Sequence, residues 1–274
     1  MLDSQDQRRI FQQAYLPEHL PGYVEAVSGA KPYLHDDYLC FFHKKHLIFI
    51  GYPLGNKLTD PVRIYDSVCE RFLPHTVAVI APEIWLPPDI CEHHPADSYY
   101  RLSLPLKSLD AGLAYMIRRA EKELQITTGE FGKEHRKLVN AFLAARKFTP
   151  EQKYVFKHIH HYLKNSKNPR LIEARKGRRL VAFTIADMGS ADYAFYMFNF
   201  RSTKDKIPGV SDLLFNEMVN ISQSEGKKAI NLGLGIHPGI RRFKEKWGGI
   251  PFLSYSSALV HRKPMELGKL ANKL

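Results

Sequence analysis

The last hundred residues carry the clearest pattern of hydrophobic and polar positions. Apolar and aromatic runs between glycine-bearing turns predict strands, and apolar spacings of three and four residues predict helices. The predicted strands are Arg170–Ala174, Arg179–Asp187, Ala191–Phe200, Ala229–Leu234 and Phe252–His261. The predicted helices start at Ser211 and Ile240, the first after a basic loop. The resulting order is β-β-β-loop-α-β-α-β.

The first half predicts a smaller α/β layer. Its apolar runs indicate strands over residues 38–42, 46–50, 76–80 and 99–105. Asp60-Pro61 predicts a helix start, because Asp is a favoured N-cap and Pro is favoured at the first helical position. The predicted buried stripe of this helix is Val62, Tyr65, Val68, Cys69 and Phe72.

Residues 108–168 change to a mostly helical pattern. We therefore expect an N-terminal domain over residues 1–107, a helical connection over 108–168 and a C-terminal domain over 169–274. Both halves run hairpin, glycine-bearing loop, helix, strand, which predicts a tandem pair of related domains. The expected fold class is α/β (α+β), with mixed sheets flanked by helices.

Composition adds an asymmetry of charge. The chain has 274 residues and a formal net charge of +12. Basic and acidic residues balance at 18 each over residues 1–150, whereas residues 151–274 hold 22 basic and 10 acidic residues. This excess favours anionic partners such as nucleotides, phosphorylated cofactors, nucleic acid or acidic lipid. A solvated basic surface is the alternative interpretation.

Several protein classes are excluded. No apolar stretch reaches the roughly 20 residues that span a bilayer, and the polar start of the chain is not a secretory signal. Three cysteines are too few and too scattered for a disulfide framework or a zinc ribbon. His158 and His161 share a helix face, but no third ligand stands at a familiar spacing. We expect a cytoplasmic protein with no transmembrane segment and no metal site.

The order of elements resembles the core of GNAT acyltransferases. Ile230–Gly235, followed by Ile240–Gly249, resembles the tail of the FemAB-like branch. The resemblance is nearest to uncharacterised proteins related to the cytoplasmic C-terminal domain of phosphatidylglycerol lysyltransferases. Ile50–Gly55 and Tyr99–Leu102 carry a similar likeness in the first half. The resemblance implies two tandem GNAT-like domains joined by a helical linker.

The same resemblance implies an acyltransferase of the aminoacyltransferase or N-acyltransferase type. It would move an acyl or aminoacyl group from an activated carrier, aminoacyl-tRNA or acyl-CoA, to an amine or hydroxyl acceptor. The expected partners are tRNA or coenzyme A, with a phospholipid or cell-wall precursor as acceptor and no tightly bound cofactor. Two rivals stay open. One is a non-catalytic anion- or nucleotide-binding module of the same fold, and the other is a nucleic-acid-binding protein.

The loop before the helix at Ser211 stands where GNAT proteins bind the pyrophosphate of their carrier. A helix N-terminus offers backbone N–H groups and partial positive charge to phosphate oxygens. We expect Gly209 to permit close backbone approach beside Val210, with further contacts from Lys204, Lys206 and Ser211. The usual pair of closely spaced glycines is reduced to one, which leaves a carrier other than coenzyme A open. An ordinary turn with a serine cap is the alternative.

The short helix after residue 237 is strongly basic. We expect Arg241 and Arg242 to bind carrier phosphate. The resemblance assigns Lys244 to the active site, where it would neutralise a developing oxyanion or a carrier phosphate. His237 is a second catalytic candidate, because a neutral imidazole can accept a proton near pH 7. The alternatives are a solvated basic face and a structural histidine. Phe243 and Trp247 are expected to anchor the helix in the core.

Overall fold

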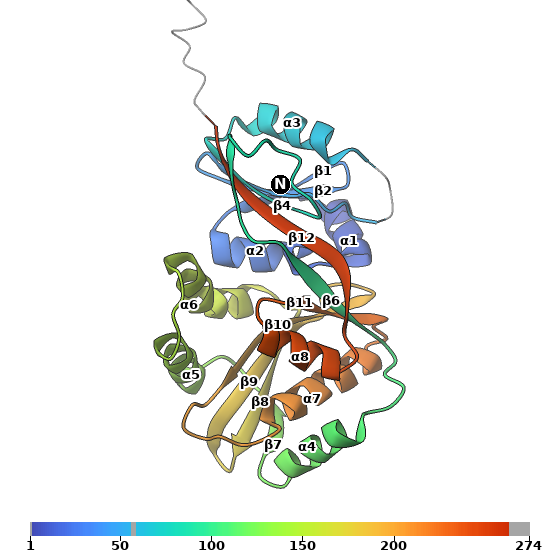
Figure 1. Cartoon of the computed structure of the whole chain (residues 1–274), viewed down its shortest axis with the longest axis vertical. Coiled ribbons are helices and arrows are strands. Elements are labelled where there is room, and N and C mark those ends of the chain that lie inside the picture. Colours follow the sequence, from blue (N-terminus) through green and yellow to red (C-terminus); the bar gives the residue numbers. More distant parts are fainter. Residues whose placement is uncertain (1, 56–58, 263–274) are drawn as a thin grey trace, which may run out of the picture. The chain divides into compact units, whose positions relative to one another are not determined.

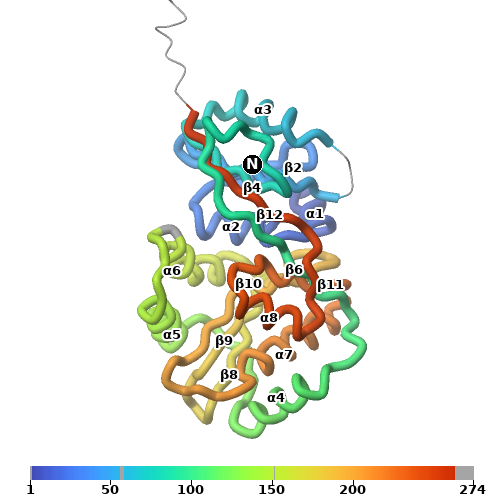
Figure 2. Tube along the Cα trace, viewed as in Figure 1, coloured from blue at the N-terminus to red at the C-terminus, as the bar shows by residue number. Residues whose placement is uncertain are grey.

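The computed structural model describes residues 2–55 and 59–262, in which the chain forms two compact units (Figures 1 and 2). Of these residues, unit 1 contains 2–6, 30–55, 59–97 and 254–262, and unit 2 contains Gln7–Gly29 and Ser98–Leu253. Residues 108–168 therefore belong to unit 2, and the last strand is shared by both units. This division differs from the three consecutive segments expected from the sequence.

Unit 1 is built on a mixed sheet in the order β1-β2-β3-β4-β12, with β5 paired to β12. Its strands are β1 (Lys31–His35), β2 (Tyr38–His43), β3 (His46–Ile50), β4 (Thr76–Ala81), β5 (Cys91–His93) and β12 (Ile250–His261). Strands β3 and β4 are parallel, and helix α3 (Pro61–Phe72) connects them, as a parallel pair requires.

Helix α3 begins as predicted. The Asp60 side chain accepts a hydrogen bond from the Val62 N–H, and Pro61 is the first helical residue. The buried face includes Ile64 and Val68, which pack with residues of β2, β3 and β4. Val62 is 37% exposed, so its predicted place in the buried stripe is wrong. Ile64 takes that place because it lies one helical turn before Val68.

Unit 2 has a sheet in the order β6-β11-β10-β9-β8-β7. The strands are β6 (Asp97–Ser103), β7 (Gln125–Thr128), β8 (Pro169–Lys176), β9 (Arg179–Asp187), β10 (Tyr193–Arg201) and β11 (Ala229–Leu234). The helices are α1 (Ser4–Gln13, which starts in unit 1), the 3₁₀ helix η1 (Pro17–His19), α2 (Pro21–Ser28), α4 (Ala111–Glu121), α5 (Lys133–Ala144), α6 (Pro150–Asn165), α7 (Val210–Ser224) and α8 (Pro238–Lys246). Strands β7 to β10 pair antiparallel, whereas β10 and β11 are parallel.

Helices cover both faces of the unit 2 sheet. Along β9, Ala182 and Ala186 face a hydrophobic cluster built with α4 and α7. Phe183 and Ile185 face a second cluster built with α5 and α6. Because alternate residues of a strand point to opposite faces, unit 2 has three layers.

The parallel pairing of β10 and β11 is short. It runs from Tyr193 opposite Ala229 to Phe195 opposite Asn231, although β10 continues to Arg201. Both strands have an irregular register near this level, β10 against β9 and β11 against β6. Such irregularities bend a strand and increase its twist. The carboxyl ends of β10 and β11 therefore lie beyond their shared ladder, where α/β sheets commonly bind ligands.

Among the described residues, none of the helices combines the length and the apolar character needed to cross a membrane.

Candidate functional site

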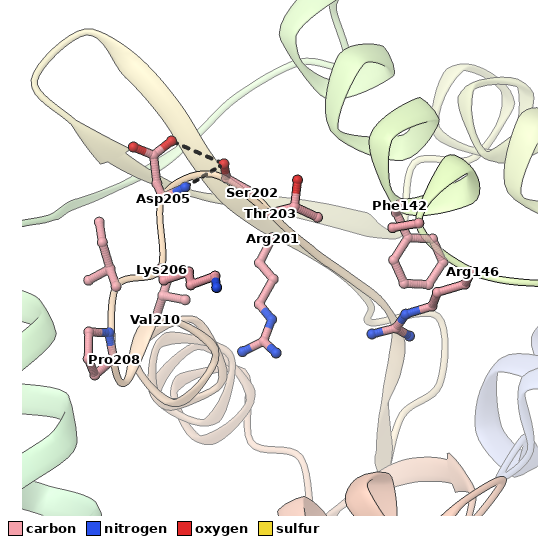
Figure 3. A pocket seen from close by; sticks show the side chains of 11 residues that line it. Phe142, Arg146, Arg201, Ser202, Thr203, Asp205, Lys206, Pro208 and Val210 are labelled. Atoms are coloured by element: carbon pink, nitrogen blue, oxygen red, sulfur yellow. Dashed lines mark hydrogen bonds between the residues drawn. The ribbon is translucent and has the colours of Figure 1, made fainter.

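A pocket of about 430 Å³ lies in unit 2 beside the start of α7 (Figure 3). Its walls are the end of α5, the end of β10 and the loop that enters α7. The charged residues in the lining are Arg146, Arg201, Asp205 and Lys206. In Figure 3 the side chains of Arg146 and Arg201 extend into the space between α5 and the loop. The lining therefore joins parts of the chain that are distant in sequence.

The acidic residue in this lining, Asp205, already has hydrogen-bond partners within the protein. An Asp205 carboxylate oxygen accepts a 2.7 Å hydrogen bond from Arg179 Nη2, and the other accepts one of 3.0 Å from the Ser202 hydroxyl. The guanidinium of Arg146 lies 4.6 Å from the centroid of the Phe142 ring, which orients it by a cation–π contact. Because Asp205 is paired with Arg179, the lining leaves a net positive charge for an anion.

Helix α7 starts here without a side-chain cap. Its N-cap is Gly209, at φ 81°, and its first residue, Val210, lines the pocket. The first N–H groups of a helix have no acceptor within the helix and carry partial positive charge. The pocket thus combines three basic side chains with a helix N-terminus, an arrangement that binds phosphate or carboxylate oxygens.

The five loop residues predicted from the sequence divide between the pocket and its surroundings. Lys206 and Val210 line the pocket, but Val210 is itself 3% exposed and its N–H donates to the Ile207 carbonyl at 3.5 Å. Lys204 is exposed and outside the lining. The alternative of a serine cap does not hold, because the N-cap of α7 is Gly209 and not Ser211. Ser211 is the second helical residue, and its hydroxyl donates to Asn199 Oδ1 at 3.3 Å.

Gly209 is needed for a contact that the sequence did not predict. A Cβ at this position would lie 2.2 Å from the carbonyl oxygen of Met116 in α4. The positive φ and this close approach both require glycine. The packing of α4 against the start of α7 is therefore sufficient to explain the residue.

Lys244 is buried at the carboxyl end of β11. It is 3% exposed, and its Nζ donates to the carbonyl oxygen of Leu234 at 2.6 Å. The Nζ also lies 5.4 Å from the centroid of the Tyr100 ring. Leu234 is the last residue of β11, beyond the ladder shared with β10. The structure thus places a positive charge where the two parallel strands are no longer paired.

His237 serves as the N-cap of α8. Its Nδ1 accepts a 3.4 Å hydrogen bond from the Ile240 N–H. An Nδ1 that accepts this bond is the nitrogen without a proton in the neutral ring. Arg241 and Arg242 are exposed on α8 and do not line the pocket.

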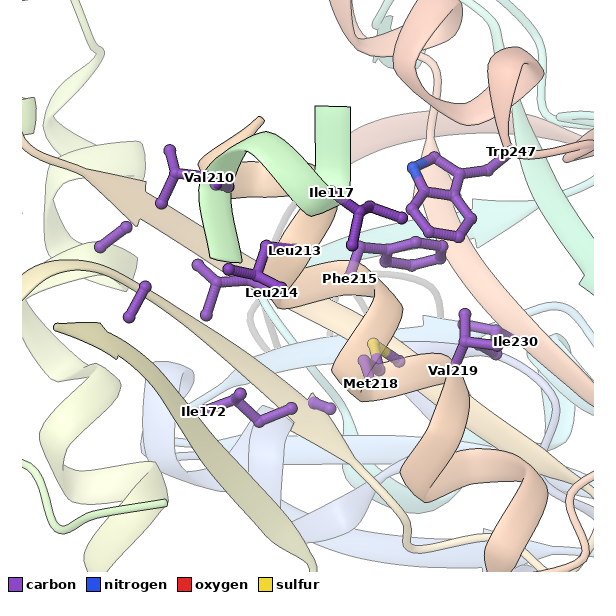
Figure 4. Close-up of a cluster of buried hydrophobic side chains, with 14 of the residues drawn as sticks. Ile117, Ile172, Val210, Leu213, Leu214, Phe215, Met218, Val219, Ile230 and Trp247 are labelled. Atoms are coloured by element: carbon purple, nitrogen blue, oxygen red, sulfur yellow. The ribbon is translucent and has the colours of Figure 1, made fainter. Parts of the chain in front are cut away.

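The anchors of α8 are confirmed. Trp247 is 2% exposed, and its ring lies 4.7 Å from that of Phe215 (Figure 4). Phe243 packs against the same cluster. Trp247 Nε1 donates to Asp212 Oδ1 at 3.2 Å, and the same oxygen lies 2.5 Å from Lys246 Nζ. Asp212, which the sequence did not single out, joins the first turn of α7 to the end of α8.

The sequence reasoning missed Arg146 and Arg201. Arg201 is the last residue of β10, a strand rich in aromatic residues, and Arg146 lies just after the end of α5. Neither arginine stands at a sequence spacing from the loop residues that would indicate a shared site. The only signal in the sequence was the basic character of each segment, because the two arginines come together only when the sheet folds.

Within residues 2–55 and 59–262, no group of three His, Cys, Asp or Glu side chains is arranged to hold a metal ion. On α6, Nδ1 of His158 hydrogen-bonds the Tyr154 carbonyl, and Nδ1 of His160 hydrogen-bonds the Lys157 carbonyl. These two rings thus use one nitrogen each within their own helix.

No protein-family model and no curated protein matches this sequence. Solved structures match its fold. A conserved protein of unknown function from Bacteroides thetaiotaomicron VPI-5482 has a TM-score of 0.65 and 14% identity, covering 94% of this chain and 98% of that one. The C-terminal DUF2156 domain of a protein described as a lysylphosphatidylglycerol synthetase from Agrobacterium fabrum has a TM-score of 0.59 and 14% identity, covering 98% and 96%. FemX has a TM-score of 0.61 and 9% identity, covering 98% of both chains.

These likenesses confirm the GNAT/FemAB-like fold expected from the sequence motifs. At 9–14% identity they concern the fold alone. The tandem arrangement, the helical linker and the roles of individual residues stay predictions.

Proposed function

On the basis of this GNAT/FemAB-like fold, we propose that the protein transfers an acyl or aminoacyl group from an activated anionic carrier to an amine or hydroxyl acceptor. The observation that carries the proposal is the pocket in which Arg146, Arg201 and Lys206 meet the uncapped start of α7. We assign these groups to the phosphates of the carrier. Coenzyme A and aminoacyl-tRNA both supply such phosphates.

The proposed transfer takes place at the carboxyl end of β11. A lone pair on the acceptor nitrogen or oxygen attacks the acyl carbonyl carbon, and the π electrons of the carbonyl move to its oxygen. The carbonyl then reforms, the bond to the carrier breaks, and the carrier leaves with that electron pair. The acceptor's proton passes to the leaving group.

Lys244 is the catalytic residue in this proposal. Its ammonium stabilises the negative charge that develops on the carbonyl oxygen, because a charge fixed in a buried site acts in a low dielectric. Its Nζ donates to the Leu234 carbonyl at 2.6 Å, which fixes the ammonium at the end of β11. The protein otherwise contributes mainly the alignment of acceptor and acyl carbon.

The remaining predicted residues take supporting roles. His237 holds the start of α8, and proton transfer through its Nδ1 would require loss of that cap. Arg241, Arg242 and Lys204 are exposed and are proposed to contact parts of the carrier outside the pocket. We propose a phospholipid or a cell-wall precursor as acceptor and the cytoplasm as the location.

The test is ligand-induced stabilisation of the purified protein by acyl-CoAs, free CoA, and charged and uncharged tRNA. A ligand at about 100 times its dissociation constant adds roughly 2.7 kcal/mol to the free energy of unfolding. We expect one carrier class to raise the melting temperature by several degrees, and R146Q/R201Q to lose that shift. Arg118→Gln, an exposed change on α4, is the control. Absence of a shift with every carrier would favour the non-catalytic module.

A further inference from the structure

Glu18 is a half-buried residue with one fully buried carboxylate oxygen, and the proposed mechanism does not use it. It lies in η1, and its Oε2 is buried without a hydrogen-bond partner among residues 2–55 and 59–262. Burial raises the pKa of this carboxyl, while hydrogen bonding by its own backbone N–H and by Tyr99 lowers it in part. Oε2 thus lacks the partner that a buried acid oxygen normally has.

Asp187 shows how the same unit satisfies a structural carboxyl. It is 1% exposed, and one oxygen accepts a hydrogen bond from the Tyr162 hydroxyl. The other oxygen accepts a 2.6 Å hydrogen bond from the Gly189 N–H. Both oxygens of Asp187 are thus engaged, whereas Oε2 of Glu18 is not. Because an unpartnered buried acceptor is costly, its retention points to a ligand.

The segment that carries Glu18 is fixed to the sheet of unit 2. The Ser190 hydroxyl donates to the Ala14 carbonyl at 2.6 Å, and Asn231 Nδ2 donates to the Tyr15 carbonyl at 2.8 Å. Asn231 is the last residue of β11 that pairs with β10. Glu18 is therefore held in place beside the point where these strands stop pairing.

Two tyrosines lie near the carboxyl, Tyr99 and Tyr23. Tyr99 is fully buried beside it. Burial and the charge of Glu18 both raise the pKa of Tyr23, which places that hydroxyl within the field of the carboxyl. The Tyr23 ring packs edge-on against Tyr162 and Phe198, at centroid distances of 5.4 and 6.2 Å. A carboxylate near aromatic rings is a suitable environment for an ammonium group.

Glu18 and Tyr99 lie near Lys244, because Tyr99 and Lys244 both meet the last residue of β11. Tyr99 is paired with Leu234 in the ladder between β6 and β11, and the Leu234 carbonyl accepts the hydrogen bond from Lys244. The next residue, Tyr100, faces Lys244 with its ring. Since successive residues of a strand point to opposite faces, Glu18 and Lys244 flank the end of β11 from opposite sides of the sheet.

We propose that Glu18 binds the ammonium group of a ligand at the end of β11, with Tyr99 and Tyr23 beside it. The inference rests on the proposed transfer, which brings an ammonium to this place from one of two sources. The aminoacyl group being transferred carries one next to its carbonyl carbon, and an amine acceptor carries one before it reacts. The chemistry that Glu18 recognises is the same for both.

Two pairs of small probes test the inference on the full chain by NMR titration. Alaninamide and lactamide differ in an ammonium against a neutral hydroxyl and represent the aminoacyl source. Ethanolamine and ethylene glycol differ in the same way and represent an acceptor. We expect at least a tenfold preference for the ammonium in one of the pairs, and the pair that shows it identifies the source. Glu18→Gln should abolish that preference.

Asp187→Asn is the matched control, because it also neutralises a buried carboxyl of unit 2. We expect Glu18→Gln to keep or raise the melting temperature, since it removes an unpartnered acid, and Asp187→Asn to lower it. The Asp187→Asn protein, at a temperature where it is folded, should keep the ammonium preference. Equal binding of ammonium and neutral probes by the unaltered protein would overturn the inference, as would a preference that survives in Glu18→Gln.

The two proposals fail separately. Carrier binding is measured on R146Q/R201Q and needs no amine probe, whereas the amine titration needs no carrier. Loss of the ammonium preference in Glu18→Gln, together with no response to any carrier, would support Glu18 and contradict the transfer. A normal carrier response without any ammonium preference would do the reverse.

Discussion

At the scale of single residues, side chains of the same type in one short segment have different environments in the folded protein. Lys244 and Lys246 lie two positions apart on α8. Lys244 is buried against the Leu234 carbonyl, whereas Lys246 is 42% exposed and pairs with Asp212. Of these two neighbouring lysines, Lys244 is thus a buried charge at the end of β11, whereas Lys246 forms an ion pair between α8 and α7.

Replacing Lys244 tests the proposed chemistry. In Lys244→Met the stem keeps its bulk while the ammonium is lost, so turnover should fall by about 100-fold or more. The melting temperature should change by a few degrees, because the Leu234 carbonyl loses one hydrogen bond. The measurement is kcat with the carrier that stabilises the protein. Glu245→Gln, an exposed change beside it, should keep turnover, and an active Lys244→Met protein would remove the assigned role.

Gly209 gives a second test at this scale. Gly209→Ala forces a Cβ to within 2.2 Å of the Met116 carbonyl oxygen at a φ of 81°. We expect a loss of about 2 to 4 kcal/mol in the free energy of unfolding, measured with urea. Gly177→Ala is the control, because φ is 57° there and nothing lies within 4 Å of the added Cβ, so its loss should stay near 1 kcal/mol. Equal losses would contradict the close approach of α4.

At the scale of elements, a few buried polar groups hold the helices of unit 2 to one another and to the sheet. Asp212 on α7 binds Trp247 and Lys246 at the end of α8. On the other side of the sheet, Nε2 of His135 in α5 lies 3.0 Å from Oε1 of Glu173 in β8, and Arg175 Nε donates to Oε2 at 2.6 Å. These contacts fix the helices that border the pocket.

Removing Asp212 should separate α7 from α8. In Asp212→Ala the buried Trp247 N–H loses its acceptor and Lys246 its partner, so the free energy of unfolding should fall by about 2 to 4 kcal/mol. Chemical denaturation measures the loss. Asp192→Asn breaks an exposed pair with Lys228 and should cost below about 1 kcal/mol. If Asp212→Ala loses no more free energy of unfolding than Asp192→Asn, the contacts of Asp212 with Trp247 and Lys246 contribute little to stability.

The contact between α5 and β8 predicts a dependence on pH. Burial lowers the pKa of His135, and the neighbouring Glu173 raises it in part. The folded protein thus binds this proton less tightly than the unfolded chain does, in which the pKa is about 6.5. Below about pH 6.5 the unfolded state gains the proton first, so stability falls as the pH falls.

Urea denaturation at pH 7.5, 6.5 and 5.5 measures this effect. His135→Gln removes the titrating group, so its stability should fall less steeply below pH 6.5, by up to about 1.4 kcal/mol for each pH unit. The two proteins should differ little in slope between pH 7.5 and 6.5. Identical slopes below pH 6.5 would contradict the lowered pKa.

At the scale of the whole molecule, the positive charge gathers in particular segments. Residues 133–167, which contain α5 and α6, hold nine Lys and Arg against two Asp and Glu. Lys153, Lys157 and Lys164 are exposed on one side of α6, four and seven residues apart. A small carrier such as coenzyme A and a long one such as tRNA should respond differently to this charge.

Salt titrations separate the two carriers. If tRNA binds along α6, changing Lys153, Lys157 and Lys164 to Gln should reduce the slope of log affinity against log salt by about 2 to 3. Binding of coenzyme A should be unchanged in the same protein. Changing Lys44, Lys45 and Arg63 of unit 1 to Gln is the control of equal charge. An unaltered slope in the α6 variant would place tRNA elsewhere.

Sequence by itself determined the features that depend on neighbouring residues. The hairpin of β2 and β3 and the Asp60 cap of α3 formed as predicted. Helix α6 likewise begins with a local capping box, in which Thr149 and Gln152 bind each other's backbone. Each depends on turn chemistry, capping or periodicity within a few positions. The motifs of the last hundred residues also indicated the GNAT-like fold correctly.

Tertiary structure decided the features that depend on distant partners. Strand β7 lies within residues 108–168, which were expected to be mostly helical. It forms because a short polar segment becomes a strand when it pairs with β8. The polar opening of the chain contains α1, in which Ile10 is the buried residue. Arg146 joins Arg201 only in the folded pocket, and Lys244 is buried because β11 ends beside it. Local patterns fix caps, turns and periods, whereas burial, pairing and converging charge are set by contacts between distant segments.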